Sequence, residues 1–188
     1  MNFLRFLMFL SLAVWLGGIL FFGAVLAPTV FMVLPTHTLA GMVVSRSIHL
    51  LHIMGIVSGI VFLAASFLYP RLLRRNMARA LAEGGLDTTP SAADARLSPS
   101  ERITRSRRLR GASQVLVVLM LALTFYSEFG LTRRMNTLRI QMGDIDSISL
   151  TDARRVEFDR LHVWATGLEE TVFVFGLAVL YLTSRRLS

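Results

Sequence analysis

The sequence has no cysteine and no lysine among its 188 residues. Without cysteine the chain forms no disulfide, and it offers no thiolate for a zinc site, an iron–sulfur cluster or nucleophilic catalysis. It also lacks a Gly-x-Ser-x-Gly element, a phosphate-binding loop and a His-Glu-x-x-His motif. We therefore predict that the protein is not an enzyme, and that any metal would be held by His, Glu, Asp or Met.

Acidic residues are scarce: 12 acids face 20 basic residues, all of them arginine, and the formal net charge is +8. Such an excess is typical of nucleic-acid binding, but these arginines flank hydrophobic runs, where they set topology and contact anionic headgroups. We predict no nucleic-acid partner. The predicted partner is the lipid bilayer, with anionic headgroups at Arg71–Arg79 and Arg102–Arg110.

Hydrophobic residues are abundant, at 54% of the chain, and the mean hydropathy is +0.59. They form four runs, near residues 6–27, 48–69, 112–131 and 163–183. About 20 apolar residues in a helix cross a hydrocarbon layer about 30 Å thick. The sequence thus predicts an all-α integral membrane four-helix bundle, a single domain over 1–188 with helical extensions beyond the bilayer. The first run is expected to be a retained helix rather than a cleaved signal peptide.

The connections differ in charge. Residues 71–111 form a basic linker, predicted to be disordered over 84–100 and helical on either side, whereas the other long connection, 132–162, mixes acids and bases. With both termini and the basic linker on one side, that side holds thirteen arginines and the other holds seven. Arginines near spans are retained in the cytoplasm. We predict a bacterial inner-membrane protein with both termini cytoplasmic.

Prolines and small residues suggest local geometry. Pro28 and Pro35 predict a turn or re-entrant bend between them, and Pro70 is predicted to stop the second helix. Small residues at Ala13 and Gly17 share a helix face, and Gly55 and Gly59 have the Gly-x-x-x-Gly spacing. Both pairs predict close helix contacts.

Two helix starts carry capping candidates. Thr36 or Thr38 can cap the second helix, and Ser149 or Thr151 can cap the last one. The helical continuations of the third and fourth spans are predicted to pack on each other outside the bilayer, with an interruption at Gly143.

The polar residues of the spans are predicted to gather in the outer half of the bundle. Glu169 and Glu170 stand inside the last apolar run, with His162 seven residues upstream on the same helix face. An ionised group in lipid costs about 2.5–3.5 kcal/mol or more, so it is usually turned inward and paired. The topology places the other candidates at the same level of the bundle. They are His37, His49, His52 and Glu128, with Trp15 on the first helix. Which of the two neighbouring glutamates faces inward stays open.

Several functions fit such a cluster. The favoured one is a non-enzymatic protein that binds or passes a small cation, with copper as a candidate and His49, His52, His162 and Glu169 as ligands. A proton or cation relay uses the same carboxylates and imidazoles. The alternatives are a structural or accessory subunit, in a homo-oligomer or membrane complex, and a b-type haem protein with His162 opposite a histidine of the second helix.

Three stretches resemble a known family. They are Trp15-Leu16-Gly17, the element Leu34-Pro35-Thr36-His37-Thr38-Leu39, and Phe158-Asp159-Arg160-Leu161-His162. In order and spacing the chain resembles a bacterial member of the poorly characterised family of eukaryotic transmembrane protein 205. The resemblance implies a four-helix membrane protein and, for the eukaryotic relative, an association with platinum-drug resistance. The chain differs at Glu169, where the family usually has Asn, and at Thr132, where Pro is common. A fainter similarity to D-type copper-resistance membrane proteins favours a metal-binding function.

Overall fold

The computed structural model describes residues 2–82 and 99–187, and in this part of the chain every regular element is a helix. The predicted linker, 84–100, therefore lies almost wholly outside the described residues. The helices are α1 (Asn2–Phe21), the π-helix η1 (Phe22–Leu26), α2 (Ala27–Val33), α3 (His37–Ala82), α4 (Pro99–Tyr126), the π-helix η2 (Ser127–Thr132), α5 (Arg133–Met142), the 3-10 helix η3 (Ile145–Ser147) and α6 (Ala153–Leu187).

These elements make four rods, because η1 joins α1 to α2 and η2 joins α4 to α5 without a break. Each rod is long and apolar enough to cross a membrane, as the sequence predicts. At 1.5 Å per residue the 46 residues of α3 span roughly 69 Å, more than twice a hydrocarbon core of about 30 Å. The described helices therefore form an all-α bundle with extensions, as predicted.

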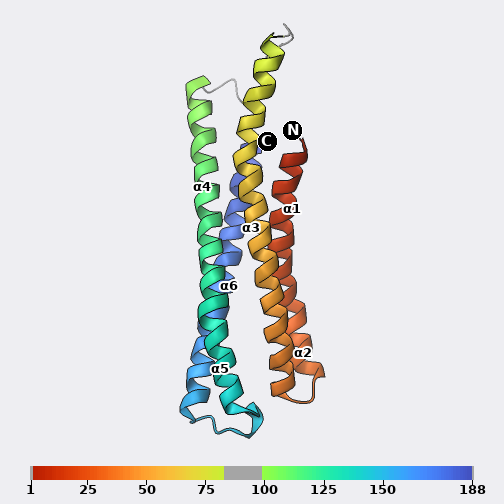
Figure 1. Ribbon diagram of the computed structural model, residues 1–188, viewed down its shortest axis with the longest axis vertical. Coiled ribbons are helices and arrows are strands. Elements are labelled where there is room, and N and C mark those ends of the chain that lie inside the picture. The colour runs from red at the N-terminus through yellow and green to blue at the C-terminus, as the bar shows by residue number, and fades with distance from the viewer. Residues whose placement is uncertain (1, 83–98, 188) are drawn as a thin grey trace.

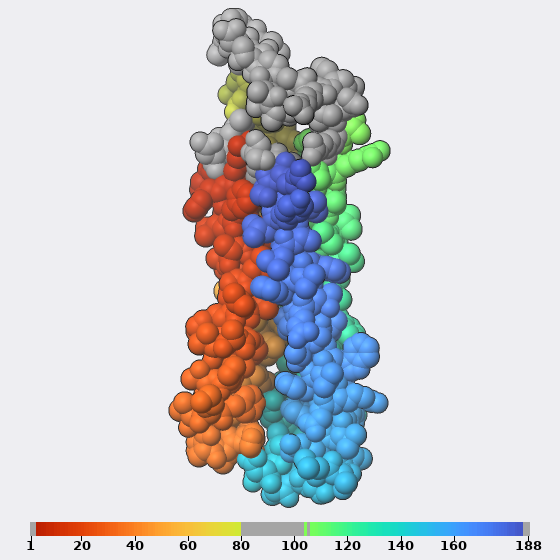
Figure 2. All heavy atoms as spheres, turned by 180° about the vertical axis from the view of Figure 1, so that it is seen from behind, coloured from red at the N-terminus to blue at the C-terminus, as the bar shows by residue number. Residues whose placement is uncertain are grey.

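The rods pack in an up-and-down arrangement with both termini at the same end (Figure 1). The main contacts join α1 to α3 and α4 to α6, while α3 also packs on α4 and α1 on α6. Figure 2 shows α1 and α6 side by side on one face. Many large apolar side chains on the outside stay exposed, a pattern that marks contact with membrane.

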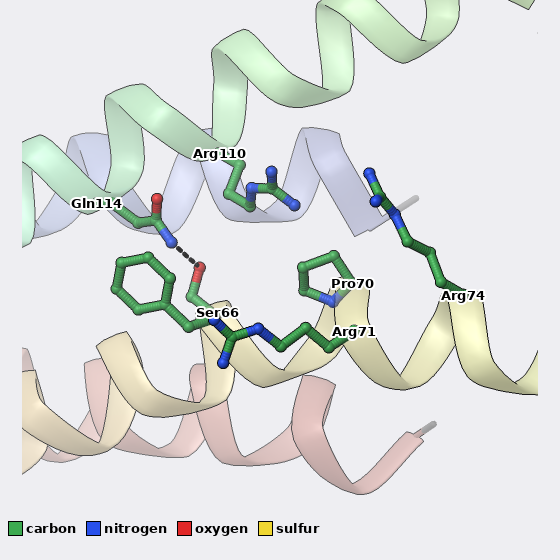
Figure 3. Close-up of a pocket in the computed structure, with 7 residues that line it drawn as sticks. Ser66, Pro70, Arg71, Arg74, Arg110 and Gln114 are labelled. Atoms are coloured by element: carbon green, nitrogen blue, oxygen red, sulfur yellow. Dashed lines mark hydrogen bonds between the residues drawn. The ribbon is translucent and has the colours of Figure 1, made fainter.

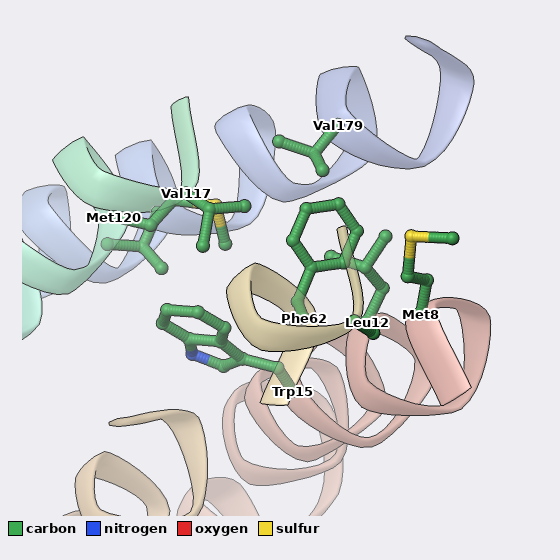
Figure 4. Packing of buried hydrophobic residues seen from close by; sticks show 9 residues of the cluster. Met8, Leu12, Trp15, Phe62, Val117, Met120 and Val179 are labelled. Atoms are coloured by element: carbon green, nitrogen blue, oxygen red, sulfur yellow. The ribbon is translucent and has the colours of Figure 1, made fainter. Parts of the chain in front are cut away.

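Apolar side chains from all four rods fill the bundle axis (Figure 4). On α1, Met8, Leu12 and Trp15 recur at helical spacing and turn inward. They meet Phe62 of α3, and the other members of this cluster are Ala65, Val117, Met120, Val172 and Val179. A band of tightly packed apolar residues thus fixes how the helices face one another.

The glycines confirm one predicted close contact and correct the other. Gly55 and Gly59 of α3 lie against Trp15, which leaves no room for a side chain at either position. A Cβ at Gly17 would meet nothing within 4 Å, whereas its neighbour Gly18 lies against Leu51 and Met54. The prediction for Gly17 is wrong because the contact face of α1 runs one residue further along the helix.

The predicted bend before Pro35 is present at Leu34 and Pro35, but the roles predicted for Pro28 and Pro70 are wrong. Pro28 lies in the first turn of α2 rather than in a bend, so the chain turns only between Val33 and His37. The rod is continuous there, and the π-helix η1 immediately before Pro28 marks a local change in the helical hydrogen-bonding pattern. Pro70 lies inside α3, which continues to Ala82. Membrane helices tolerate an internal proline when neighbouring helices support the backbone.

The loops at the end away from the termini are tied together. The backbone N–H of His37 donates to Asp146 Oδ2 (3.0 Å), and its ring Nδ1 lies 2.7 Å from Asp146 Oδ1. Thr38 Oγ1 donates to Asp144 Oδ1 (2.8 Å) and accepts from Ile145 N–H (3.1 Å). The N-terminus of α3 therefore receives carboxylates from the α5–α6 connection, which suits the positive end of a helix dipole.

The helix caps are partly as predicted. Thr36 Oγ1 accepts from Leu39 N–H (3.2 Å), which confirms Thr36 as a cap of α3. The cap of α6 is Asp152, whose Oδ1 accepts from Arg154 N–H (2.8 Å). Ser149 instead accepts from Thr151 N–H within the loop, because α6 begins later than the sequence signals suggest.

Beyond the spans, α5 and α6 pack through a second apolar cluster. Leu138, Met142 and Ile145 are its buried members, and Ile148, Phe158 and Leu161 pack against it. Gly143 ends α5 with a positive φ of 68°. The contact between the two helical continuations and the break at Gly143 are confirmed, while their place outside the bilayer stays a prediction.

Replacing Asp152 by Asn is expected to lower the thermal unfolding temperature slightly at pH 7. The hydrogen bond from the Arg154 side chain lowers the pKa of Asp152 to about 2. A lowered pKa stabilises the fold above the carboxyl group's ordinary pKa of 3.8, and this contribution is lost as the pH falls through about 2. The difference between the two proteins should therefore shrink in acid, and a difference that grows there would contradict the assignment.

Candidate functional site

A carboxylate–imidazole chain crosses the bundle between three helices. His52 of α3 lies between two glutamates: its Nδ1 is 2.7 Å from Glu128 Oε2, and its Nε2 is 2.7 Å from Glu169 Oε1. The second carboxylate oxygen of Glu128, Oε1, lies 2.5 Å from His49 Nδ1. Glu169, His52, Glu128 and His49, here called the relay, thus form one continuous hydrogen-bonded row.

Burial changes along the relay. The His52 side chain is 1% exposed, the two glutamates are 12% and 14% exposed, and His49 is 39% exposed. The centre of the row is therefore shielded, while His49 gives it an open end. A polar row of this kind is stable in an apolar bundle only because each group has a partner.

Local helix geometry explains why these four residues meet. His49 and His52 are three residues apart on α3, so they lie on one face of the helix. Glu128 belongs to the π-helix η2, and π-turns inside longer helices are frequent at functional sites. On α6, Glu169 is 14% exposed whereas Glu170 is exposed, because neighbours on a helix point about 100° apart.

The hydrogen bonds of the relay require protons between the imidazole nitrogens and the carboxylate oxygens. An imidazole donates from both nitrogens only when it is doubly protonated, and otherwise one nitrogen accepts and needs a protonated carboxyl group as its donor. Either way a proton is shared along the row from Glu128 to Glu169.

A cavity of about 770 Å³ lies beside the open end of the relay, between α3 and the η2–α5 rod. His49 and Glu128 line it together with Arg46, Arg133 and Arg139. The relay therefore ends in a space that is large enough for water and small solutes.

The other predicted site residues lie apart from the relay. His37, the first residue of α3, pairs with Asp146 of η3, and His162 and Glu170 are exposed. Trp15 is 2% exposed and belongs to the apolar core. The seven-residue spacing of His162 and Glu169 does not bring both side chains into the bundle. His162 is exposed, whereas Glu169 is 14% exposed and contacts His52.

The arrangement of donors does not favour a metal centre. In the described part of the chain, no group of three or more His, Cys, Asp or Glu side chains is placed to hold a metal ion. Both ring nitrogens of His52 are directed at carboxylate oxygens, and neither is directed at His162. The copper and b-type haem interpretations stay predictions that these contacts do not support.

An arginine-lined pocket of about 240 Å³ lies between α3 and α4 towards the end that holds the termini. Side chains of the two helices face each other across it, with Gln114 Nε2 donating to Ser66 Oγ at 3.3 Å (Figure 3). Its charged members are Arg71, Arg74 and Arg110. Both predicted headgroup-contact segments therefore contribute arginines to this pocket.

Sequence reasoning missed Arg139. In the sequence it is one of six arginines of the 132–162 connection. In the structure its side chain is half-buried and lines the 770 Å³ cavity. The Phe158 ring covers one face of its guanidinium, with the guanidinium carbon 5.5 Å from the ring centroid, and this shields the group from water. No sequence signal separates this arginine from its exposed neighbours, since the difference arises from packing against α6.

Comparison with known proteins gives a match for the first two rods. Residues 10–85 match the model of a domain of unknown function (DUF4149). No curated protein and no solved structure matches the chain. The matched residues include Trp15, His49 and His52 but end before Glu128 and Glu169, so half of the relay lies within the matched segment and half lies beyond it.

Proposed function

We propose that the protein binds and passes a small cation, the proton, through the relay. The observation that carries this proposal is His52, held between the carboxylates of Glu128 and Glu169 at 2.7 Å on each side. Intramembrane ionisable groups are expensive, and where they occur in rows they serve as proton pathways. The row has an open end at His49, where the cavity supplies water.

The path beyond Glu169 is closed by the apolar core. Trp15, Phe62 and Val172 are each at most 2% exposed and fill the bundle axis. A proton that crosses the whole bundle therefore needs the helices to move, a change that takes microseconds to milliseconds or longer. The flux should accordingly be slow and saturable, as in a carrier rather than an open channel.

The decisive experiment compares Glu169→Gln with Glu170→Gln. Liposomes that contain the wild-type protein and a pH-sensitive dye should exchange protons down an imposed pH gradient faster than empty liposomes. Glu169→Gln keeps a hydrogen-bond acceptor but has no proton to give, so the flux should fall about tenfold or more. Glu170→Gln changes an exposed neighbour and should leave the flux near the wild-type value.

Thermal unfolding of the same proteins distinguishes a role of Glu169 in proton transfer from a role in holding the helices together. Unchanged unfolding with lost flux agrees with a relay. If Glu169→Gln lowers stability while wild-type liposomes pass no more protons than empty ones, the competing role is favoured, namely a structural or accessory subunit whose carboxylates hold helices or a partner together.

The predictions on family, membrane and lipid contacts are also proposals. We propose that the chain is a bacterial relative of the transmembrane protein 205 family, which the order and spacing of the three resembling stretches support. The bias of arginines supports an inner-membrane protein with cytoplasmic termini. On that side, Arg71, Arg74 and Arg110 around the 240 Å³ pocket would contact anionic lipid headgroups.

A further inference from the structure

The 770 Å³ cavity carries an excess of positive charge. Three arginines line it, Arg46, Arg133 and Arg139, and Glu128 is its acidic residue. Both oxygens of Glu128 are already engaged by His49 and His52. Among the described residues, the arginines that pair with carboxylates are Arg134, Arg154 and Arg155, so the three cavity arginines keep their charge available.

Arg139 is the most unusual of the three. Its Nε is buried and has no hydrogen-bond partner among the described residues, and its Nη1 reaches Asn136 Oδ1 only at 3.5 Å. Phe158 covers one face of the guanidinium. A Cβ at Gly41 would lie 3.5 Å from Nη2, an ordinary contact distance, so the guanidinium packs against α3 at this glycine. The group is thus held in place by packing while its N–H donors remain poorly used.

A half-buried cation without an anionic partner is costly, and the cost is relieved when an anion binds. Guanidinium groups match the oxygens of phosphate in a two-point geometry. The cavity also has apolar lining from Met42, Phe129 and Ile140, which suits an organic body attached to the anion. Its volume falls in the usual range for small-molecule sites.

We propose that this cavity binds a phosphate ester, with Arg139 as the principal contact and Arg46 and Arg133 as supporting charges. The phosphate group belongs either to a free water-soluble ester or to a lipid headgroup that enters from the membrane. The proposal does not depend on proton flux, because Glu169 does not line the cavity.

Calorimetric titration of the purified protein in a neutral detergent tests the proposal with two probes, glycerol 3-phosphate and dihexanoyl phosphatidic acid. Binding of glycerol 3-phosphate supports a free ester, and binding of the lipid alone supports a headgroup. Glycerol and dihexanoylglycerol, which lack the phosphate, should not bind. If neither phosphate probe binds, the proposal is overturned.

Two variants test the assigned contact. Arg139→Gln should weaken binding about tenfold or more, since a charge-assisted hydrogen bond is lost. Arg160→Gln removes an exposed arginine of α6 that lines neither the 770 Å³ cavity nor the 240 Å³ pocket, and it should bind as the wild type does. Equal losses in both variants would indicate non-specific attraction to positive charge and overturn the proposal.

Thermal unfolding guards against a folding defect. Without probe, Arg139→Gln should be at least as stable as the wild type, because it removes a poorly paired buried cation. Added probe should raise the unfolding temperature of the wild type but not that of Arg139→Gln. Glu169→Gln should bind the probe normally, so that a failure of the relay and a failure of this site give different results.

Discussion

Replacing Glu128 by Ala should destabilise the protein by about 3–5 kcal/mol, the usual cost of removing one partner from a buried charged network. Glu128 is 12% exposed and is the shared partner of two histidines. Its loss leaves both Nδ1 atoms without the acceptor at 2.5 Å and 2.7 Å and breaks the link between α3 and η2. Proton flux should be lost as well, because the row is cut in its middle.

The measurement is thermal unfolding in detergent, with Glu157→Ala as the matched control. Glu157 lies on α6 and accepts from the Arg134 side chain at 2.9 Å and 3.2 Å, with both side chains partly exposed. Exposed ion pairs contribute little to stability, so this variant should unfold close to the wild type. A Glu128→Ala protein that is no less stable than the Glu157→Ala protein would contradict the buried network described here.

Replacing Gly55 by Leu should break the contact between α1 and α3 at a cost of up to about 3 kcal/mol, at the upper end for an overpacked core. A side chain at this position meets the indole of Trp15, which is 2% exposed in the centre of the bundle. The indole also lies against Gly59, with Cζ3 2.8 Å from the position of a Cβ. Trp15 therefore has no room to retreat along α3.

Gly17→Leu is the control, because a Cβ there meets nothing within 4 Å. In a Trp164→Phe background, where Trp15 is the remaining tryptophan, Gly55→Leu should shift the fluorescence emission towards that of a solvent-exposed indole. The Gly17→Leu protein should keep the emission of a buried one. Similar emission from both variants would mean that Trp15 does not depend on the glycine face of α3.

The architecture is largely predictable from composition and pattern. Four apolar runs of about 20 residues give four rods, and Thr36 marks the start of α3 as its side chain predicts. The misplaced helix limits come from Pro28 and Pro70, since rules learned from soluble helices overstate how strongly proline interrupts a helix that neighbours support.

The site is less predictable. Grouping His49, His52, Glu128 and Glu169 follows from topology, because residues at similar distances from helix ends lie at similar depth. Pairing them does not, since it depends on the rotation of each helix. That rotation turns Glu169 inward and Glu170 outward, and it leaves His162 exposed despite favourable spacing. The partnerless Nε of Arg139 arises from packing with Phe158, which spacing along the chain does not report.

Pro70 has a mechanical consequence for the end of α3. It donates no backbone hydrogen bond, so the helix is more easily bent there than elsewhere. The twelve residues from Arg71 to Ala82 extend roughly 18 Å beyond it at 1.5 Å per residue. A bend of about 10° at Pro70 would carry their tip sideways by about 3 Å on this geometry, so small movements within the bundle are magnified in the basic arm that projects from it.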